Sequence, residues 1–386
     1  MSRDPSVSRP RLVTPSFVVV GVATLAYFLG ESAVFPVLPV YVRGPLGGDD
    51  VAVGLSVGAF SVTALLIRPW AGRLADRRGR RFPMVLGSAI FAASVAGYLL
   101  ADTVPLLVVM RLLTGVGEAF VFTGAASAIA DMAPDERRGE AISFFSLALW
   151  TGIAIGPLIG ELAVHSGGFS LVWLIAAGFG LVSGGLALAV RTPSITSAEE
   201  DTVPSLVHRR ALLPGTTLLL SIWGAAGFFA FVPLFARDLG LGGSRFVFML
   251  FSGTIVLIRL FGARIPDVFG PVRVARFSLA VSAAGLVAMG LWGTVVGLFV
   301  GTAVFAVGQA LAFPALMALA LQGAPPRERG AVVATFTAFV DIGFGLGPAA
   351  LGFVAKAGGY GATFLAGSVV ALVGLGLLLT RYRGRT

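Results

Sequence analysis

Only a few charged side chains interrupt the long apolar runs of this 386-residue sequence. Glu31, Glu118 and Asp341 are carboxylates within such runs, and Arg111 precedes Glu118 by seven residues, which places both on one face of a helix. A charge near the centre of a bilayer costs at least about 2.5–3.5 kcal/mol, so it needs a partner or a water-filled cavity. A carboxylate removed from water holds a proton more tightly and can load and release it near neutral pH. We therefore expect proton binding, or binding of a cationic substrate, at Glu31 and Glu118.

These groups also have structural interpretations. The two glutamates could form a static ion pair with Arg111. Asp341 could lie close to the cytoplasmic side and pair there with Arg73 or Arg77. Glu161 falls toward the outer end of its apolar run, where we expect water to solvate it.

The elements that must position these residues are membrane-spanning helices. Hydrophobic residues make up 56% of the chain and charged residues only 12%, against roughly 25% charged in an ordinary soluble domain. A helix crosses the hydrocarbon with roughly 20 apolar residues, and the continuous runs favour helices over a barrel. The sequence predicts twelve such helices: 16–42, 51–71, 82–101, 105–130, 141–163, 169–190, 211–236, 244–262, 273–293, 294–321, 331–355 and 361–380.

The net charge of +9 would suggest nucleic acid in a soluble protein, but its distribution indicates a membrane orientation. With the N-terminus inside, 21 of the 28 basic residues fall in cytoplasmic segments and four fall outside. This asymmetry follows the positive-inside rule and predicts that both termini are cytoplasmic. The chain has no cysteine, which excludes disulfides and thiolate chemistry.

An internal repeat with an offset of 191 residues divides the chain into two halves. Arg68 falls on Arg259, both at predicted helix ends where arginine commonly extends to the interface, and Glu118 falls on Gln309. Further matches without a gap are Asp76 with Asp267, Gly79 with Gly270, Gly117 with Gly308, Gly152 with Gly343, Gly156 with Gly347 and Pro157 with Pro348. Six helices separate the copies, so the halves should have the same orientation, as in one class of secondary transporter.

Three motifs resemble those of the major facilitator superfamily. The loop after the second predicted helix resembles the family's loop motif through Gly72, Arg73, Asp76, Arg77, Gly79 and Arg80. The segment Arg111–Gly117 resembles its fourth-helix motif. The fifth-helix segment resembles the family's antiporter motif through Gly152, Gly156, Pro157 and Gly160, although Glu161 stands where a glycine is usual.

The motifs also have a physical logic that is independent of the family. Asp76 can meet a helix N-terminus or an arginine and latch the cytoplasmic side, or the loop can be only a positive anchor. The glycines spaced four apart permit close helix packing, and Pro157 permits a bend. The resemblance implies a transporter, most similar to twelve-helix drug/proton antiporters that are associated with multidrug resistance.

Other classes of function find little support. The only lysine, Lys356, lies outside any P-loop pattern, and the match Gly54–Gly58 to G-x-S-x-G lies within a helix. His165 and His208 fall on opposite sides of the membrane, which argues against a zinc site. We expect no enzyme activity, no metal, no cofactor and no nucleic-acid partner. A remote alternative is a non-transporting sensor with the same fold.

The resulting prediction is an all-α membrane protein with bundles at 1–190 and 211–386 and a cytoplasmic linker at 191–210. We expect proton-coupled efflux of small amphipathic or lipophilic compounds, driven by the proton gradient, from a monomer in a bacterial inner membrane. The alternative is transport of a defined polar metabolite such as a sugar. Its site would need several amide and hydroxyl groups, which are sparse here. The candidate site residues are Glu31, Arg111, Glu118, Gln309 and Asp341.

Overall fold

The computed structural model describes residues 13–134, 137–191, 208–262, 265–325 and 328–382, and these contain helices but no strand. The elements are α1 (Pro15–Ala33), α2 (Leu38–Arg43), α3 (Asp50–Arg78), α4 (Arg81–Ala96), the 3-10 helix η1 (Gly97–Leu100), α5 (Val104–Met132), α6 (Arg138–Leu188), α7 (Arg209–Asp238), α8 (Arg245–Phe261), α9 (Ile265–Phe269), α10 (Pro271–Leu291), α11 (Val295–Leu321) and α12 (Arg329–Arg381). Most of the predicted linker lies outside the described residues.

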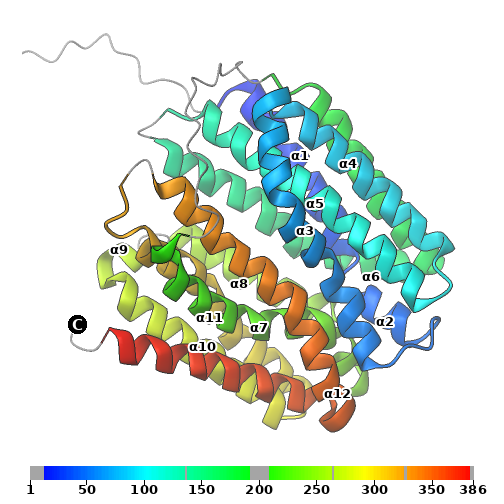
Figure 1. Ribbon diagram of the computed structural model, residues 1–386. Helices are drawn as coiled ribbons and strands as arrows, with labels where there is room; N and C mark the ends of the chain where they lie inside the picture. Colours follow the sequence, from blue (N-terminus) through cyan, green and yellow to red (C-terminus); the bar gives the residue numbers. More distant parts are fainter. Residues whose placement is uncertain (1–12, 135–136, 192–207, 263–264, 326–327, 383–386) are drawn as a thin grey trace, which may run out of the picture.

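The helices form two bundles that follow the order of the chain (Figure 1). In the first bundle α1 packs on α6, α3 packs on α5, and α4 packs on α5 and α6. In the second, α7 and α10 pack on α12, and α11 packs on α10. The bundles meet where α3 contacts α12 and where α6 contacts α8. Side chains carried by these four helices can therefore act between the bundles.

The 191-residue repeat of the sequence is also a repeat of structure. Helices α5 and α11 begin at Val104 and Val295, and α6 and α12 begin at Arg138 and Arg329, each pair 191 residues apart. Both Gly79 and Gly270 have positive φ, 78° and 84°, and each precedes the next helix of its bundle. This left-handed backbone is one that glycine adopts without a steric cost. Equivalent turns thus occur at equivalent places in both halves.

Nine helices in the described residues are long and apolar enough to cross a membrane. Two of them, Glu140–Leu188 and Ala331–Arg381, have 49 and 51 residues, far more than one crossing needs. Each contains a non-helical glycine: Gly168 with φ 70° and Gly359 with φ 77°, again 191 residues apart. Helix α8 is apolar but has only 17 residues.

The first predicted helix is two helices in the structure. Helix α1 ends at Ala33, residues 34–37 form a turn, and α2 starts at Leu38. Pro36 lies in this turn and Pro39 occupies the first turn of α2. Because proline lacks a backbone donor and disfavours the helical conformation of the residue before it, the two prolines account for the interruption. Glu31 consequently lies in the last turn of α1, beside the break.

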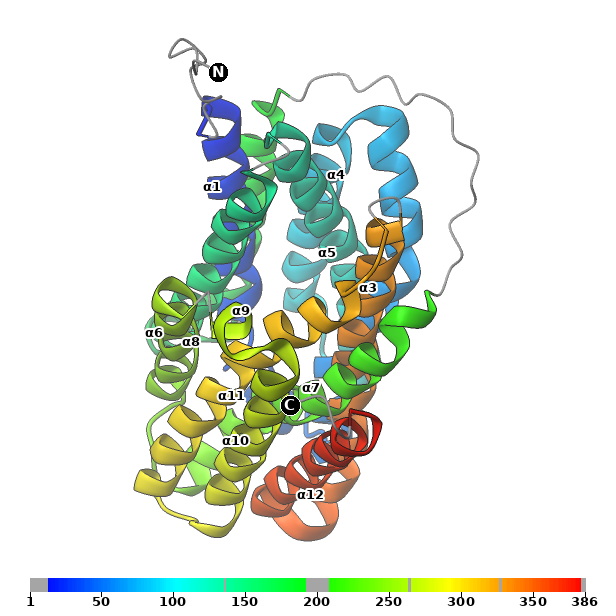
Figure 2. The same ribbon diagram turned by 90° about the vertical axis from the view of Figure 1, so that its left-hand side faces the viewer.

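The ends of the helices define two sides of the molecule. We call the side where α1 begins and α12 ends the terminal side; the connections α5–α6 and α8–α9 also lie there (Figures 1 and 2). The opposite side carries the connections α2–α3 and α7–α8. The Asp49 side chain caps the start of α3 there by accepting a hydrogen bond from the Ala52 backbone at 2.9 Å.

Candidate functional site

Two buried carboxylates and the half-buried Arg68 form a cluster of charges that joins the two bundles. Arg68, on α3, donates a hydrogen bond from Nη2 to Asp341 Oδ1 at 2.8 Å, and its Nε lies 2.7 Å from Asp341 Oδ2. The same Nη2 lies 3.3 Å from Glu118 Oε1 on α5. The guanidinium carbon also stands 4.8 Å from the centre of the Phe122 ring. Arg68 therefore pairs with two carboxylates: Glu118 of its own bundle and Asp341 of the other bundle.

This arrangement differs from the ion pairs that the sequence suggested. Asp341 pairs with Arg68 instead of Arg73 or Arg77, and Glu118 pairs with Arg68 instead of Arg111. Arg68 therefore does not extend to the membrane interface. The sequence suggested Arg111 as the partner of Glu118 because residues seven apart share a helix face. A partner on another helix produces no such spacing in the sequence.

Arg111 is almost fully buried, and it bonds to the backbone of α3. Its Nε donates to the carbonyl of Ser56 at 2.9 Å and its Nη2 donates to the carbonyl of Val57 at 3.1 Å. The guanidinium carbon lies 4.6 Å from the centre of the Phe60 ring. These contacts fasten α5 to α3 and orient the helix that carries Glu118.

Glu31 is buried, and its Oε2 has no hydrogen-bond partner within the described residues. The hydroxyl of Tyr27, one turn earlier on α1, is buried and unpartnered in the same way. One carboxylate oxygen of Glu118, Oε2, is also without a partner there. Since a buried polar group without a partner is costly, these atoms are places where a proton or a substrate group could bind.

Gln309, the counterpart of Glu118, turns toward serines of its own bundle. Its Nε2 donates to Ser221 Oγ at 3.1 Å and to Ser282 Oγ at 3.2 Å. The structure thus brings Glu118 and Asp341 together and places Gln309 in a separate neutral contact.

The counterpart of Arg68 has a different setting. Arg259, near the end of α8, lies with its guanidinium carbon 5.0 Å from the Trp150 ring centre on α6. Both side chains line a cavity of about 340 Å³ between α6, α8 and α11 on the terminal side. Arg259 does not extend away from the protein as the sequence suggested. No pattern in the sequence singled out Trp150.

The loop motif after α3 forms a charged contact on the terminal side. Arg80 pairs with Asp76 one turn before it, and its Nε lies 2.6 Å from Asp131 Oδ2 at the end of α5. Asp76 therefore meets an arginine, one of the two partners that its position suggested. Gly72 lies in the last turns of α3, and Arg73 and Arg77 follow on the same helix. Gly79 supplies the left-handed turn into α4.

The glycine motif of α6 forms the contact surface with α1. A Cβ at Gly152, Gly156 or Gly160 would collide with Phe28, Leu29 or Ala33, respectively. Pro157 lies inside the helix between these glycines. These glycines thus lie in close contact with α1, whereas the antiporter role of the motif stays a prediction.

Polar contacts on the opposite side close the two bundles against each other. Glu161 is buried and accepts hydrogen bonds from the backbone N–H and the hydroxyl of Ser244, the latter at 2.8 Å, so it is not solvated as expected. Lys356 Nζ lies 2.8 Å from Asp49 Oδ2. The hydrogen bond from Lys356 lowers the pKa of Asp49, so this contact persists at neutral pH and is lost only as pH falls through the lowered pKa.

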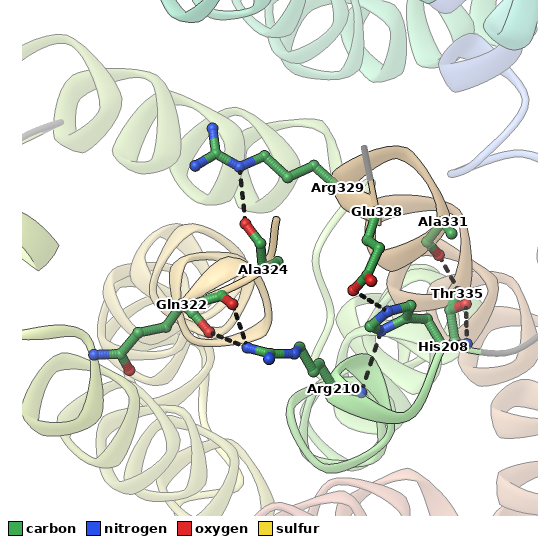
Figure 3. A network of polar contacts seen from close by, with 9 residues as sticks. His208, Arg210, Gln322, Ala324, Glu328, Arg329, Ala331 and Thr335 are labelled. Atoms are coloured by element: carbon green, nitrogen blue, oxygen red, sulfur yellow. Dashed lines mark hydrogen bonds and ion pairs between the residues drawn. The ribbon is translucent and has the colours of Figure 1, made fainter. Parts of the chain in front are cut away.

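A second polar network ties the start of α7 to α11 and α12 on the terminal side (Figure 3). His208 Nε2 lies 3.1 Å from Glu328 Oε2, and the His208 backbone N–H donates to Thr335 Oγ1 at 2.9 Å. Arg210 donates to the carbonyls of Gln322 and Gly323. These contacts fix the first turn of the second bundle next to the end of the predicted linker.

Comparison with known proteins agrees with this architecture. The family model of the Major Facilitator Superfamily matches residues 20–267 and 219–386. An uncharacterized MFS-type transporter of Salmonella typhimurium is 31% identical over 346 residues, which cover 87% of this chain and 89% of the relative. The uncharacterized MFS-type transporter YhhS of Escherichia coli is 30% identical over 357 residues, covering 89% of this chain and 86% of the relative.

Solved structures show the same fold at low sequence identity. A bacterial homologue of the human lysosomal transporter Spinster, in an inward-facing and occupied conformation, superposes with a TM-score of 0.79 at 18% identity; the match covers 95% of this chain and 96% of that one. The fold, the repeat of 191 residues and the family match lead to one conclusion. This chain belongs to the major facilitator superfamily of membrane transporters.

Proposed function

We propose that this protein is a proton-coupled secondary transporter that exports small amphipathic or lipophilic compounds by alternating access. The observation that carries the proposal is the cluster around Arg68, because one arginine is shared by carboxylates from both bundles. Protonation of Asp341 or Glu118 would remove a charge from the contact that spans the bundles. Proton uptake would thereby weaken one contact between the halves and favour their relative motion.

The surroundings of Glu31 and Glu118 support their role as proton sites. Both side chains are buried, and each keeps one oxygen without a hydrogen-bond partner in the described residues. Protonation from outside and release to the cytoplasm would drive substrate in the opposite direction. The apolar cavity between α6, α8 and α11 supports the choice of an amphipathic substrate, because its lining carries few polar groups that could recognise a sugar.

We further propose twelve membrane crossings in two parallel sixes, with both termini in the cytoplasm of a bacterial inner membrane. The glycine breaks at Gly168 and Gly359 would divide α6 and α12 into two crossings each, and α8 would add one more. Because the chain has no cysteine, single cysteines at Asp102 and at Gln322 can report their side of the membrane with a membrane-impermeant thiol reagent. Labelling of both positions from the same side would contradict this topology.

The transport proposal is tested by substrate flux in proteoliposomes with an imposed pH gradient. The substrates are three compounds with one ring system: 1-naphthoate, 1-naphthamide and 1-naphthylmethylammonium. We expect the gradient to accelerate movement of at least one of them, and E31Q or E118Q to abolish the acceleration. The control D102N neutralises an exposed loop carboxylate and should transport like the wild type. Flux that ignores the gradient, or coupling that survives in both glutamate variants, would refute proton-driven export.

A further inference from the structure

The repeat places a second copy of the Arg68 cluster in the other half of the molecule, but with its carboxylates replaced. Arg68 corresponds to Arg259, and Phe122 corresponds to Phe313. The two acidic positions become neutral: Glu118 corresponds to Gln309, and Asp341 corresponds to Trp150. The second copy therefore keeps the cation and has lost both counter-ions.

Within the described part of the chain, the contacts of Arg259 confirm that it has no carboxylate partner. Where Arg68 lies 2.7 Å from a carboxylate oxygen of Asp341, Arg259 faces the ring of Trp150 at 5.0 Å. No described carboxylate lies within 4.0 Å of the Arg259 guanidinium, and its buried Nε has no hydrogen-bond partner there. Gln309 directs its amide to two serines. A desolvated guanidinium without a counter-ion is energetically unfavourable, and an incoming anion would relieve the cost.

The cavity beside Arg259 has room for such an anion. Its volume is about 340 Å³, and apolar side chains make up most of its lining, among them Phe144, Leu147, Trp150, Leu311 and Pro314. Glu140 also lines the cavity, but it is exposed and its carboxylate is bound by Arg137 at 2.8 Å. The site thus combines one cation, a flat aromatic surface and an apolar wall.

We propose that Arg259 and Trp150 form a subsite for a small organic anion with a flat apolar body. The guanidinium would bind a carboxylate through two parallel hydrogen bonds, and the ring of the ligand would lie along Trp150 and the apolar wall. A cation of the same shape would be repelled by Arg259. This inference names the substrate class of the export proposed above and rests on that proposal for its transport role, but binding can be measured without transport.

Equilibrium binding to the full-length protein in a neutral detergent tests the subsite. Titration calorimetry should show tighter binding of 1-naphthoate than of 1-naphthamide, by about ten- to a hundredfold, as a charge-assisted contact gives. The compound 1-naphthylmethylammonium should bind most weakly. R259Q should reduce the affinity for 1-naphthoate to that for 1-naphthamide, whereas R259K should retain part of the preference. Equal affinities for the anion and the amide in the wild type would overturn the proposal.

Two further variants separate the ligand contact from general damage to the fold. W150D supplies the counter-ion that Asp341 gives to Arg68, so it should abolish the preference for the anion while the protein stays folded by size-exclusion chromatography. R245Q is the matched control, because Arg245 lies on the same helix, 5.0 Å from the ring centre of Phe246, and away from the cavity lining. If R245Q lowers the anion preference as much as R259Q does, the effect is the loss of net charge and the subsite is refuted.

The anion could also come from a lipid headgroup, and a competition arm distinguishes the two sources. The titration is repeated with phosphatidylglycerol or zwitterionic phosphatidylcholine added to the micelles. Equal binding of 1-naphthoate in both supports a site for a free organic anion. Complete displacement by phosphatidylglycerol alone would assign Arg259 to a lipid and overturn the proposal. If flux does not depend on the pH gradient but the protein still binds 1-naphthoate in preference to 1-naphthamide, only the proposed export mechanism is refuted.

Discussion

At the scale of single residues, the setting of a buried charge decides what it can do. Arg68 and Arg259 are the same residue type at equivalent positions, yet one holds two carboxylates and the other faces a tryptophan. Bringing an ion pair out of water costs several kcal/mol per ion, so the Arg68 cluster need not stabilise the fold relative to apolar residues. Removing one partner of the pair, in contrast, destabilises the protein, because the other partner is left as a buried charge without a counter-ion.

This asymmetry gives a prediction for Arg68. R68Q should destabilise the protein by about 3–5 kcal/mol, because Glu118 and Asp341 would remain buried together without a cation. Adding D341N should recover part of the loss, since it removes one of the stranded charges. The measurement is the temperature at which the protein leaves the monodisperse peak in size-exclusion chromatography after heating. The control R78Q changes an exposed arginine of the same helix and should leave that temperature almost unchanged. An R68Q protein as heat-resistant as R78Q would contradict the prediction.

The sequence identified Glu31, Glu118 and Asp341 as buried carboxylates but could not identify Arg68 as the partner of Glu118 and Asp341. Glu118, Asp341 and Glu31 are conspicuous because charge is rare in an apolar run, and all three are buried in the structure. Arg68 and Asp341 are 273 residues apart, and no periodicity along one helix relates them. The contact follows from how two bundles meet, which depends on the packing of whole helices.

At the scale of elements, the apolar runs of the sequence predicted most helix positions. The predicted start at 294 and the observed start of α11 at Val295 differ by one residue, and Thr294 caps this helix by accepting from the Gly297 backbone. The break between α1 and α2 was missed, although Pro36 and Pro39 were visible, because apolar residues continue on both sides. Hydropathy reports where a segment lies and is insensitive to a local turn.

The glycine surface of α6 allows a prediction about one element. G156A should destabilise the protein by about 1–3 kcal/mol, because the new Cβ would stand 2.8 Å from the Leu29 carbonyl oxygen of α1 and force the helices apart. G178A is the matched control on α6: its Cβ would meet no atom within 4 Å, and alanine favours a helix by up to about 1 kcal/mol. Heating followed by size-exclusion chromatography compares the two. The close-packing role of Gly156 would be refuted if both variants behaved alike.

At the scale of the whole molecule, the distribution of contacts between the bundles suggests which end is closed. Glu161 with Ser244 and Asp49 with Lys356 join the bundles on the opposite side, where α3 and α12 also pack closely. The cavity beside Arg259 lies on the terminal side. If the protein works by alternating access, the contact between α3 and α12 must loosen in each cycle so that the opposite side can open.

A cross-link between α3 and α12 tests this requirement, and the cysteine-free chain gives it no background. A Cβ at Gly345 would lie 3.7 Å from Ser61 Cβ, within the range of about 3.5–4.5 Å found in disulfides. Oxidation of S61C/G345C should therefore join the bundles and stop substrate flux in proteoliposomes, and a reductant should restore it. The control S88C/G184C bridges α4 and α6 inside one bundle, where the corresponding separation of 3.2 Å is slightly shorter than this range, and the oxidised control should leave flux intact. If fully cross-linked S61C/G345C transports substrate at an undiminished rate, α3 and α12 need not separate during transport. That result would refute a transport cycle in which the two bundles move apart at this contact.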